Sequence, residues 1–279
     1  MIETGLKRAA VIEDLSGYGR CALTIALPVL AACGVESVPI PTAVLSSHMG
    51  LPGAVITDLT DTMLPAAQQY HALNVPFDAL YVGFLNSETQ LTIVEEMCAL
   101  LKKENTLLLL DPVMGDNGRL YRSVTTHMAE KMRLLCKKAD FLTPNLTEAA
   151  ALLGLPLNAL QTKEDAAQAA KQLCVLGAKN VILTGVPNGE RISMFLAQHE
   201  SGAVQEVTAT RIDGAFHGTG DLFDSVLLGK LLRNVPPAEA VHQAAAFVSI
   251  CVERTSRASS TSIGGLHFEA ELHRLWKTE

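Results

Sequence analysis

The sequence predicts an α/β protein built on a mostly parallel central sheet with helices on both faces. Short apolar runs alternate along the 279 residues with longer amphipathic or alanine-rich segments, which is the pattern of repeated βαβ units. Leu107–Leu110 is apolar at every position, as expected of a strand that is covered on both faces. Aromatic residues make up only 5% of the chain against 48% hydrophobic residues, so Ala, Leu and Val are expected to form most of the core.

Strands and helices are expected to alternate in chain order. The strands are short apolar runs, at residues 9–12, 35–40, 79–82, 107–110, 141–143, 181–183 and 192–197. The helices are longer segments with apolar residues at helical spacing, at residues 21–32, 87–103, 125–137, 147–153, 163–176, 220–233 and 238–254. Pro236-Pro237 is interpreted as a turn between the last two helices. No repeat or break in composition divides the chain, so residues 1–279 are expected to form one domain.

Composition argues against several classes of protein. The 22 basic residues against 29 acidic ones give a net charge of −7, without a basic run, which disfavours nucleic-acid binding through phosphate contacts. The longest apolar stretch, residues 23–35, contains Pro28 and Gly34 and is shorter than the about 20 residues of a membrane span. The chain start shows no signal-peptide pattern. The six cysteines are dispersed without a CxxC pair, which indicates reduced thiols in a cytoplasmic protein.

Ligands of open parallel sheets bind at the carboxyl ends of the strands, so the segments after each strand are the candidate site. Gly17-Tyr18-Gly19-Arg20-Cys21-Ala22 follows the first strand and matches a dinucleotide-binding pattern. That interpretation also needs an acidic residue after the second strand, and the nearby Glu36 comes before it. No GxxxxGK[ST] sequence is present, which excludes the P-loop class.

The strongest signal is the glycine-rich turn that leads into the helix at residues 220–233. In Gly218-Thr219-Gly220-Asp221, the glycines allow a tight turn and direct backbone N–H groups outward. The amino end of the helix adds partial positive charge, which favours phosphate oxygens there. Asp221 is either a charge that stabilises the helix dipole or a base that accepts a proton from an attacking hydroxyl. An anion-binding turn beside a carboxylate is suited to phosphoryl transfer.

Two further strand ends carry polar groups. Asp111 directly follows the apolar run at residues 107–110, where a carboxylate is more often functional than structural. In Asn145-Leu146-Thr147-Glu148, Asn145 follows Pro144 and has the spacing to Glu148 of a capping box. This spacing is fully explained by helix capping, although the carboxylate of Glu148 is still expected to point into the crevice.

Taken together, these segments resemble a known family. Gly218-Thr219-Gly220-Asp221 near the end of an α/β chain resembles the signature of the ribokinase superfamily. The sequences Asp111-Pro112-Val113-Met114-Gly115-Asp116 and Thr143-Pro144-Asn145-Leu146-Thr147-Glu148, with the opening VIEDLSGYG, resemble its pyridoxal kinase branch. The resemblance implies a ribokinase-like three-layer α/β/α fold and ATP-dependent phosphorylation of the 5′-hydroxymethyl group of a vitamin B6 vitamer.

The resemblance also assigns roles on the nucleotide side of the site. It implies that Asp221 is the general base and that the amides of Gly218, Thr219 and Gly220 hold the developing charge. Asp111, Asn145 and Glu148 are implied to organise Mg²⁺ near the phosphates of ATP. Thr184, at the end of another strand, is expected in the nucleotide site. The loop at residues 116–121 is expected to cover the nucleotide, or else to be an ordinary surface loop.

On the vitamer side, the resemblance places a loop containing Ser46, His48 and Met49 over the vitamin ring. His217 adjoins the glycine-rich turn, but no chemistry is assigned to it. Pyridoxal kinases commonly carry a Ser that bonds the ring nitrogen where this sequence has Asp14. An ionised carboxylate only accepts hydrogen bonds, so Asp14 is expected to prefer a ring with a protonated nitrogen or an amino group. Alternatively, Asp14 caps the turn into the next helix.

Two other functions share the scaffold. One is a hydroxymethylpyrimidine (phosphate) kinase of thiamine synthesis, and the other is a protein that binds a vitamer without turnover. The presence of Asp221, Asn145 and Glu148 argues against the second. The resemblance further implies a homodimer and the use of a monovalent cation such as K⁺.

Overall fold

A nine-stranded sheet forms the centre of the protein. The computed structural model describes residues 5–122, 124–212, 214, 216–258 and 263–276. The strands of the large sheet are β1 (Lys7–Tyr18), β2 (Val35–Ser47), β3 (Ile56–Asp58), β4 (Ala79–Val82), β5 (Leu107–Leu110), β8 (Phe141–Leu142), β9 (Asn180–Asn188), β10 (Arg191–Gln198) and β11 (Val204–Thr210). A separate two-stranded ribbon consists of β6 (Gly115–Asp116) and β7 (Arg119–Leu120).

The strand order places the centre of the site. The order across the sheet is β11-β10-β9-β8-β5-β4-β1-β2-β3. The pairs from β2 through β1, β4, β5 and β8 to β9 are parallel, and β3, β10 and β11 add antiparallel pairs at the two edges. The chain leaves β1 for β2 on one side and returns to β4 on the other. This reversal creates a crevice at the carboxyl end of β1, which is where ligands of such sheets bind.

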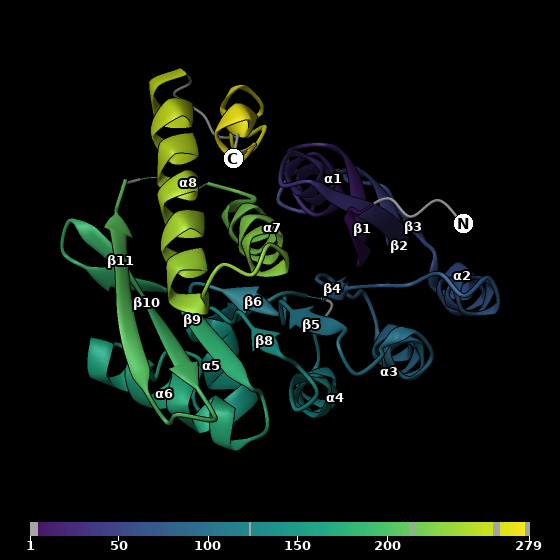
Figure 1. The fold of residues 1–279 in the computed structure, drawn as a ribbon. Helices are drawn as coiled ribbons and strands as arrows, with labels where there is room; N and C mark the ends of the chain where they lie inside the picture. The colour runs from purple at the N-terminus through teal and green to yellow at the C-terminus, as the bar shows by residue number, and fades with distance from the viewer. Residues whose placement is uncertain (1–4, 123, 213, 215, 259–262, 277–279) are drawn as a thin grey trace.

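Helices cover both faces of the sheet (Figure 1). On one face lie α2 (Thr60–Ala72), α3 (Glu88–Leu101), α4 (Thr126–Cys136), α5 (Leu146–Leu153) and α6 (Lys163–Val175). On the other lie α1 (Leu23–Ala32), α7 (Thr219–Leu232) and α8 (Pro237–Ala258), with the 3₁₀ helix η1 (Glu269–Arg274) beside them. Each face of the sheet has its own hydrophobic cluster. The arrangement confirms the predicted three-layer α/β/α fold with a mostly parallel sheet.

Local sequence explains most of the helix starts. Ser87, Thr125 and Thr162 each accept a hydrogen bond from a backbone N–H in the first turn of α3, α4 and α6, as N-cap residues do. α8 begins at Pro237, a residue well suited to the first turn of a helix because it lacks an N–H. Pro236-Pro237 therefore lies at the junction of the last two helices, as predicted.

The structure also differs from the predicted element list. Residues 60–72 form α2 although the segment is only weakly hydrophobic and contains Pro65. The strands β3 and β11 are largely exposed and lack the apolar runs by which buried strands are recognised. Three strands extend far beyond their predicted ends, because β1 continues to Tyr18, β2 to Ser47 and β9 to Asn188.

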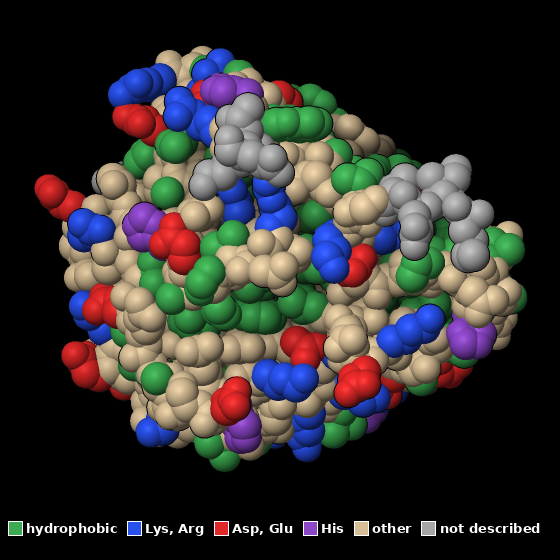
Figure 2. Space-filling view, viewed as in Figure 1, with side chains coloured by type: hydrophobic (Ala, Val, Ile, Leu, Met, Phe, Trp, Pro, Cys, Tyr) green, Lys and Arg blue, Asp and Glu red, His purple; other side chains and the backbone are tan. Residues whose placement is uncertain are grey.

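No helix within the described residues is long and apolar enough to cross a membrane. All six cysteines have free thiols. Figure 2 shows Lys, Arg, Asp and Glu side chains interspersed on one face of the protein, with hydrophobic side chains gathered across its middle. The single-domain organisation stays a prediction.

Candidate active site

A cavity of about 720 Å³ lies where the carboxyl ends of the central strands meet the amino end of α7. It brings together all of the residues that were predicted for the nucleotide side. These are Asp111, Asn145, Glu148, Thr184, Gly218, Thr219, Gly220 and Asp221. A smaller depression of about 410 Å³ lies elsewhere and is lined by lysines; two of them, Lys102 and Lys179, form ion pairs with Asp140.

The glycine-rich turn forms the amino end of α7. Gly218 is the N-cap residue with φ 83°, and no side chain caps the helix. The first N–H groups of a helix have no partner within the helix, so the amides that follow Gly218 face the cavity as donors. A Cβ on Gly218 would lie 2.3 Å from the carbonyl oxygen of Arg20. Glycine is therefore required here both by the backbone angle and by the close approach of another segment.

Asp221 is held in place by a backbone amide from the other side of the cavity. Its Oδ2 accepts a hydrogen bond of 2.9 Å from the N–H of Ala22, which precedes α1. Ala22 has φ 46°, an uncommon angle for a residue with a side chain. Burial raises the pKa of Asp221 above its ordinary value. The carboxylate thus has a fixed orientation and a raised proton affinity, both of which suit a general base.

Asp111 lies at the end of β5, beside the turn. Its Oδ2 is 3.7 Å from the position that a Cβ on Gly220 would occupy. The residue is 8% exposed, and burial together with the charge of Asp224 raises the pKa of its carboxyl group. No N–H or hydroxyl group of the described residues donates a hydrogen bond to this carboxylate, which leaves it available to a ligand in the cavity.

Asn145 and Glu148 form the predicted capping box at the start of α5. The Asn145 side chain accepts from the N–H of Glu148 at 3.0 Å, and Glu148 Oε2 accepts from the N–H of Asn145 at 2.9 Å. Glu148 Oε1 accepts from the N–H of Met114 at 3.0 Å, and the Asn145 amide donates to the carbonyl oxygen of Gly115 at 2.8 Å. Burial raises the pKa of Glu148 to about 8. Helix capping is therefore confirmed, and both side chains also fix the turn that follows Asp111.

Thr184 lies in β9 and joins the same strand ends. Its N–H and hydroxyl donate to the carbonyl oxygen of Pro144 at 2.9 and 3.4 Å, and it pairs with Asn145 in an isolated parallel bridge. The ribbon β6–β7 and Tyr121 border the cavity from the outside. This placement agrees with the predicted position of residues 116–121 next to the nucleotide site, and their covering role stays a prediction.

Asp14 lies at an irregularity in β1. The pairing of β1 with β2 shifts register between Glu13 and Leu15, as happens at β-bulges, which often adjoin active sites. The side chain is 7% exposed and accepts a hydrogen bond of 2.9 Å from the hydroxyl of Ser16. Burial raises the pKa of Asp14 to about 6. The alternative role as a helix cap is wrong, because Asp14 lies within β1 and Ala22 is the N-cap residue of α1.

The residues predicted to cover the vitamin ring occupy different environments. Ser46 is exposed, and its hydroxyl oxygen accepts from the N–H of Val55 at 2.9 Å. Met49 is 63% exposed. Neither residue lines the cavity described above, and their contact with a substrate stays a prediction.

His48 is buried, and both of its ring nitrogens are used within the chain. Nδ1 accepts from the N–H of Gly50 at 3.2 Å, and Nε2 lies 3.0 Å from the carbonyl oxygen of Ile263. These partners assign the neutral tautomer that carries its proton on Nε2. The ring also lies 4.5 Å from the ring of His217, centroid to centroid. His48 therefore links the loop after β2 to the glycine-rich turn, and its contact with a substrate stays a prediction.

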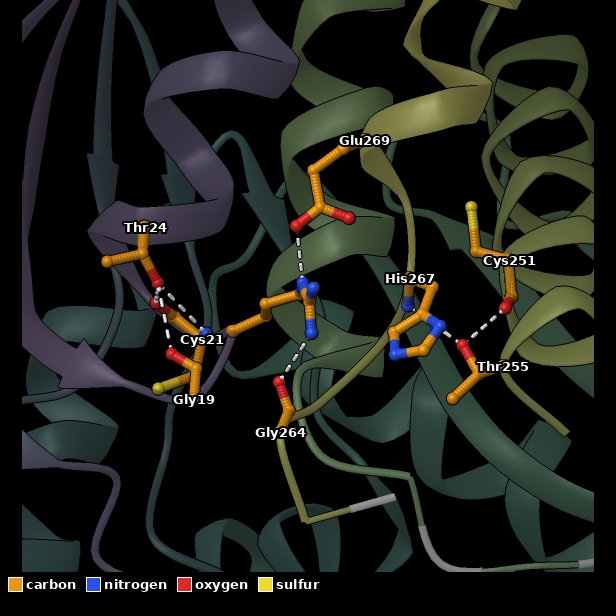
Figure 3. Close-up of polar contacts among 9 residues, drawn as sticks. Gly19, Cys21, Thr24, Cys251, Thr255, Gly264, His267 and Glu269 are labelled. Carbon is orange, nitrogen blue, oxygen red and sulfur yellow. Dashed lines mark hydrogen bonds and ion pairs between the residues drawn. The ribbon is translucent and has the colours of Figure 1, made fainter. Parts of the chain in front are cut away.

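The segment at residues 263–269 packs against the connection between β1 and α1. Arg20, between β1 and α1, forms an ion pair with Glu269, and its guanidinium donates to the carbonyl oxygen of Gly264 at 3.0 Å. Figure 3 shows Gly264 and Glu269 facing the segment that contains Gly19, Cys21 and Thr24. A Cβ on Gly265 would lie 2.8 Å from the carbonyl oxygen of Arg20. Nothing in the sequence pattern had indicated this contact.

Asp224 is a further acidic residue that the sequence interpretation missed. It lies one turn after Asp221 in α7 and is 1% exposed. Its Oδ2 accepts from the hydroxyl of Thr143 at 2.9 Å, whereas its Oδ1 is buried without a hydrogen-bond donor among the described residues. The spacing of three residues from Asp221 in a predicted helix was the available signal, because residues three apart share a helix face.

Comparison with known proteins agrees with this geometry. The family model for phosphomethylpyrimidine kinase matches residues 27–266. A pyridoxine/pyridoxal/pyridoxamine kinase of Bordetella bronchiseptica is 31% identical over 258 residues, which cover 88% of this chain and 89% of that protein. A Caenorhabditis elegans relative is 34% identical over 180 residues, which span 62% of this chain and 55% of that protein.

Solved structures show the same architecture. A Bacteroides thetaiotaomicron protein assigned to the phosphomethylpyrimidine kinases, crystallised with pyridoxal, has a TM-score of 0.92 and 36% identity, covering 97% of this chain and 96% of that one. Pyridoxal kinase from Lactobacillus plantarum has a TM-score of 0.89 and 29% identity, with 97% and 96% coverage. The chain belongs to the phosphomethylpyrimidine kinase family, in the ribokinase-like branch that contains the pyridoxal kinases.

Proposed function

We propose that this protein transfers the γ-phosphoryl group of ATP to the 5′-hydroxymethyl group of a vitamin B6 vitamer, giving the 5′-phosphate and ADP. The observation that carries the proposal is the amino end of α7, where the first backbone amides after Gly218, which have no partner within the helix, and the fixed carboxylate of Asp221 line one cavity. The named kinases among the relatives and the pyridoxal in the Bacteroides crystal support a vitamer as the substrate.

The chain's own groups supply positioning and proton transfer. The N–H groups of residues 219–221 donate to the oxygens of the transferring group, where negative charge develops. Asp221 accepts the proton of the attacking hydroxyl, while the Ala22 amide keeps the carboxylate directed at the cavity. The contacts of Arg20 and His48 with residues 263–264 hold the surrounding loops together, which shields the reacting groups from water.

The donor set fits a magnesium ion. The cavity presents hard oxygen donors, and Mg²⁺ is bound through one or two carboxylates, water and substrate phosphates. Within the described part of the chain, the Asp111 carboxylate accepts no hydrogen bond from an N–H or hydroxyl group, whereas Asn145 and Glu148 are engaged by backbone groups. Asp111 would therefore hold the ion directly, with Asn145 and Glu148 positioning the turn and contacting its waters. Bound Mg²⁺ would neutralise charge on the phosphates during transfer.

The assembly and location are also proposals. The exposed apolar side chains of Val44, Val55 and Ile56 lie on or beside the edge formed by β2 and β3, which supports a homodimer through this edge. Sedimentation velocity should then give twice the mass of one chain, and Val55→Asp should give monomers. The free cysteines support a cytoplasmic location. The use of K⁺ is tested by exchanging it for Na⁺ in the assay below.

The test is ATP consumption with a panel of acceptors: pyridoxal, pyridoxine, pyridoxamine and hydroxymethylpyrimidine. Turnover with the vitamers at a kcat/KM at least tenfold above that with the pyrimidine is expected. The reverse preference would favour the thiamine-synthesis kinase, an alternative consistent with the matching family model. Vitamer binding without ADP production would show a non-catalytic protein.

A further inference from the structure

Two buried carboxylates from different elements line the cavity. Asp111 comes from the end of β5 and is 8% exposed, and Asp224 comes from α7 and is 1% exposed. Both line the cavity, together with Thr143 from the end of β8. Among the neighbouring charges, that of Asp224 raises the pKa of Asp111 most, which indicates that the two carboxyl groups are neighbours.

One buried oxygen of this pair has no hydrogen-bond donor among the described residues. The Thr143 hydroxyl satisfies Asp224 Oδ2, but Asp224 Oδ1 is buried with no donor among the described residues. The charges that act most strongly on Asp224 are those of Asp221 and Glu148, which are negative as well. A buried carboxylate without a donor or a positive partner is costly. The unpartnered oxygen of Asp224 is therefore available to a cation, and a bound cation would offset the cost of ionising the pair.

Two other acidic residues of the cavity have different roles. Both carboxylate oxygens of Glu148 accept backbone N–H groups, and Asp221, which accepts from Ala22 through one oxygen, is the proposed base. Within the described residues, no three or more His, Cys, Asp or Glu side chains form a ready-made metal cluster. Two carboxylates completed by water and phosphate oxygens are what Mg²⁺ commonly uses, whereas Ca²⁺ takes six to eight oxygen ligands.

We propose that Asp224 is a direct ligand of the Mg²⁺ ion together with Asp111, so that the protein binds the ion before the nucleotide arrives. This inference rests on the proposed ATP-dependent function and adds to it a ligand and an order of binding. Water molecules would complete the coordination in the free protein, and phosphate oxygens would replace some of them when ATP binds.

The test measures Mn²⁺, as a paramagnetic substitute for Mg²⁺, bound to the nucleotide-free protein by the electron paramagnetic resonance of the free ion. Wild-type protein should bind one Mn²⁺ per chain. Asp224→Asn keeps the size of the side chain and should raise the Kd at least tenfold, as should Asp111→Asn. Asp116→Asn is the matched control, because it removes one acidic charge from the same cavity lining, and its Kd should stay within twofold.

Stability separates a ligand from a structural role. In metal-free buffer at pH 8, Asp224→Asn should raise the Tm because it removes one of two facing charges. Addition of Mn²⁺ should then raise the Tm of the wild type more than that of the variant. A lower Tm of the metal-free variant, with unchanged Mn²⁺ affinity, would overturn the proposal and show that Asp224 only anchors Thr143.

A parallel titration with ADP present separates this inference from the proposed function. If wild type binds Mn²⁺ only with ADP, ion binding before the nucleotide is wrong and the role of magnesium stands. If no Mn²⁺ binds even with ADP, the magnesium part of the proposed function is wrong as well. Equal Kd values for wild type and Asp224→Asn in both titrations would remove Asp224 from the ion site.

Discussion

Replacement of Asp221 by Asn tests the proposed base with little change in shape. Asn has the size of Asp, and its carbonyl oxygen can still accept the hydrogen bond from the Ala22 N–H that fixes the wild-type side chain. The variant should therefore keep the turn, the amides after Gly218 and the contact between α7 and α1. What it loses is the ability to take a proton, because an amide is not a base at neutral pH.

The expected effect is a fall in kcat of about 10²–10⁴-fold, the usual contribution of a positioned acid–base group. This corresponds to about 3–5 kcal/mol of transition-state stabilisation. Residual activity should remain, because the amides at the amino end of α7 still hold the transferring group. Removal of one negative charge near the phosphates should leave the KM for ATP unchanged or slightly lower.

The assay is steady-state ADP production with pyridoxal, combined with calorimetric measurement of ADP binding. Asp221→Ala provides a comparison that also loses the hydrogen bond to Ala22, so its Tm should fall while that of Asp221→Asn stays close to wild type. Near-normal kcat in Asp221→Asn would refute the assignment of the base. A parallel loss of ADP binding and Tm would instead show that Asp221 serves the fold.

Three further predictions follow from single contacts. Glu148→Gln places an NH₂ group where Glu148 accepts a backbone N–H. The variant should therefore lower the free energy of unfolding by about 1–3 kcal/mol and raise the Mg²⁺ concentration needed for half-maximal activity. An unchanged Mg²⁺ requirement would limit the role of Glu148 to helix capping. Gly218→Ala should abolish detectable turnover and lower the Tm, because its Cβ would lie 2.3 Å from the carbonyl oxygen of Arg20. Gly189→Ala is the control: Gly189 has φ 60° and open space around it, so the substitution should lower the free energy of unfolding by only about 1–2 kcal/mol. Asp14→Ala should raise the KM for the vitamer about tenfold and leave the KM for ATP within about twofold. Because the pKa of Asp14 is raised to about 6, the wild-type kcat/KM for the vitamer should also fall below pH 6, as Asp14 takes up a proton. The same pH profile in wild type and Asp14→Ala would contradict ring binding by Asp14.

The raised pKa of Asp14 also has a consequence for stability. The rise from 3.8 to about 6 means that the folded state disfavours the ionised form. Protonated Asp14 therefore contributes to the free energy of unfolding, and this contribution is fully present below pH 3.8 and is lost as the pH rises through about 6. Its full loss lowers the free energy of unfolding by about 3 kcal/mol. Asp14→Ala should gain stability relative to wild type between pH 4 and pH 7, as measured by urea unfolding.

The buried strands were predictable because their sequence has only one interpretation. β4 and β5 begin and end at the predicted residues, 79–82 and 107–110, since both are continuous apolar runs next to polar residues. β1 and β2 were predicted too short for the opposite reason. Beyond Ile12 the strand contains Glu13 and Asp14, and β2 contains Pro39 and Pro41, which are residues that normally end a strand. The paired neighbours in the sheet hold these segments extended.

The site residues were predictable where reactive or metal-binding side chains follow the ends of strands. Asp111, Asn145, Glu148 and Asp221 follow apolar runs or a glycine-rich turn, and the parallel sheet brings all such ends to one edge. The amide of Ala22 was not predictable, because every residue except proline has the same backbone N–H group. The contact of Arg20 with residues 263–269 joins the two ends of the chain, and no local pattern encodes such a contact.

Asp224 was missed because α7 is not amphipathic in the structure. Residues 222–230 are all buried between the sheet, α1 and α8, so the expected apolar stripe does not separate an inner from an outer face. In a helix that is buried on all sides, a polar residue must have a partner or a function. An acidic residue in such a helix, one turn from a functional aspartate, is therefore a stronger signal than the same residue on a surface helix.

The charge of the cavity constrains how a nucleotide can enter it. Asp111, Asp221 and Asp224 line the cavity in which the ATP phosphates are proposed to bind, and each of these carboxyl groups repels phosphate when it is ionised. The amides of α7 offset only part of this repulsion, because the amino end of a helix carries about half an elementary charge. Burial lowers the pKa of His217 in the lining, so positive charge must come from Arg211, which also lies there, or from a cation. If Asp111 and Asp224 bind Mg²⁺ first, the site changes from repelling phosphate to attracting it, and the affinity for ADP should rise with Mg²⁺ far more in wild type than in Asp224→Asn.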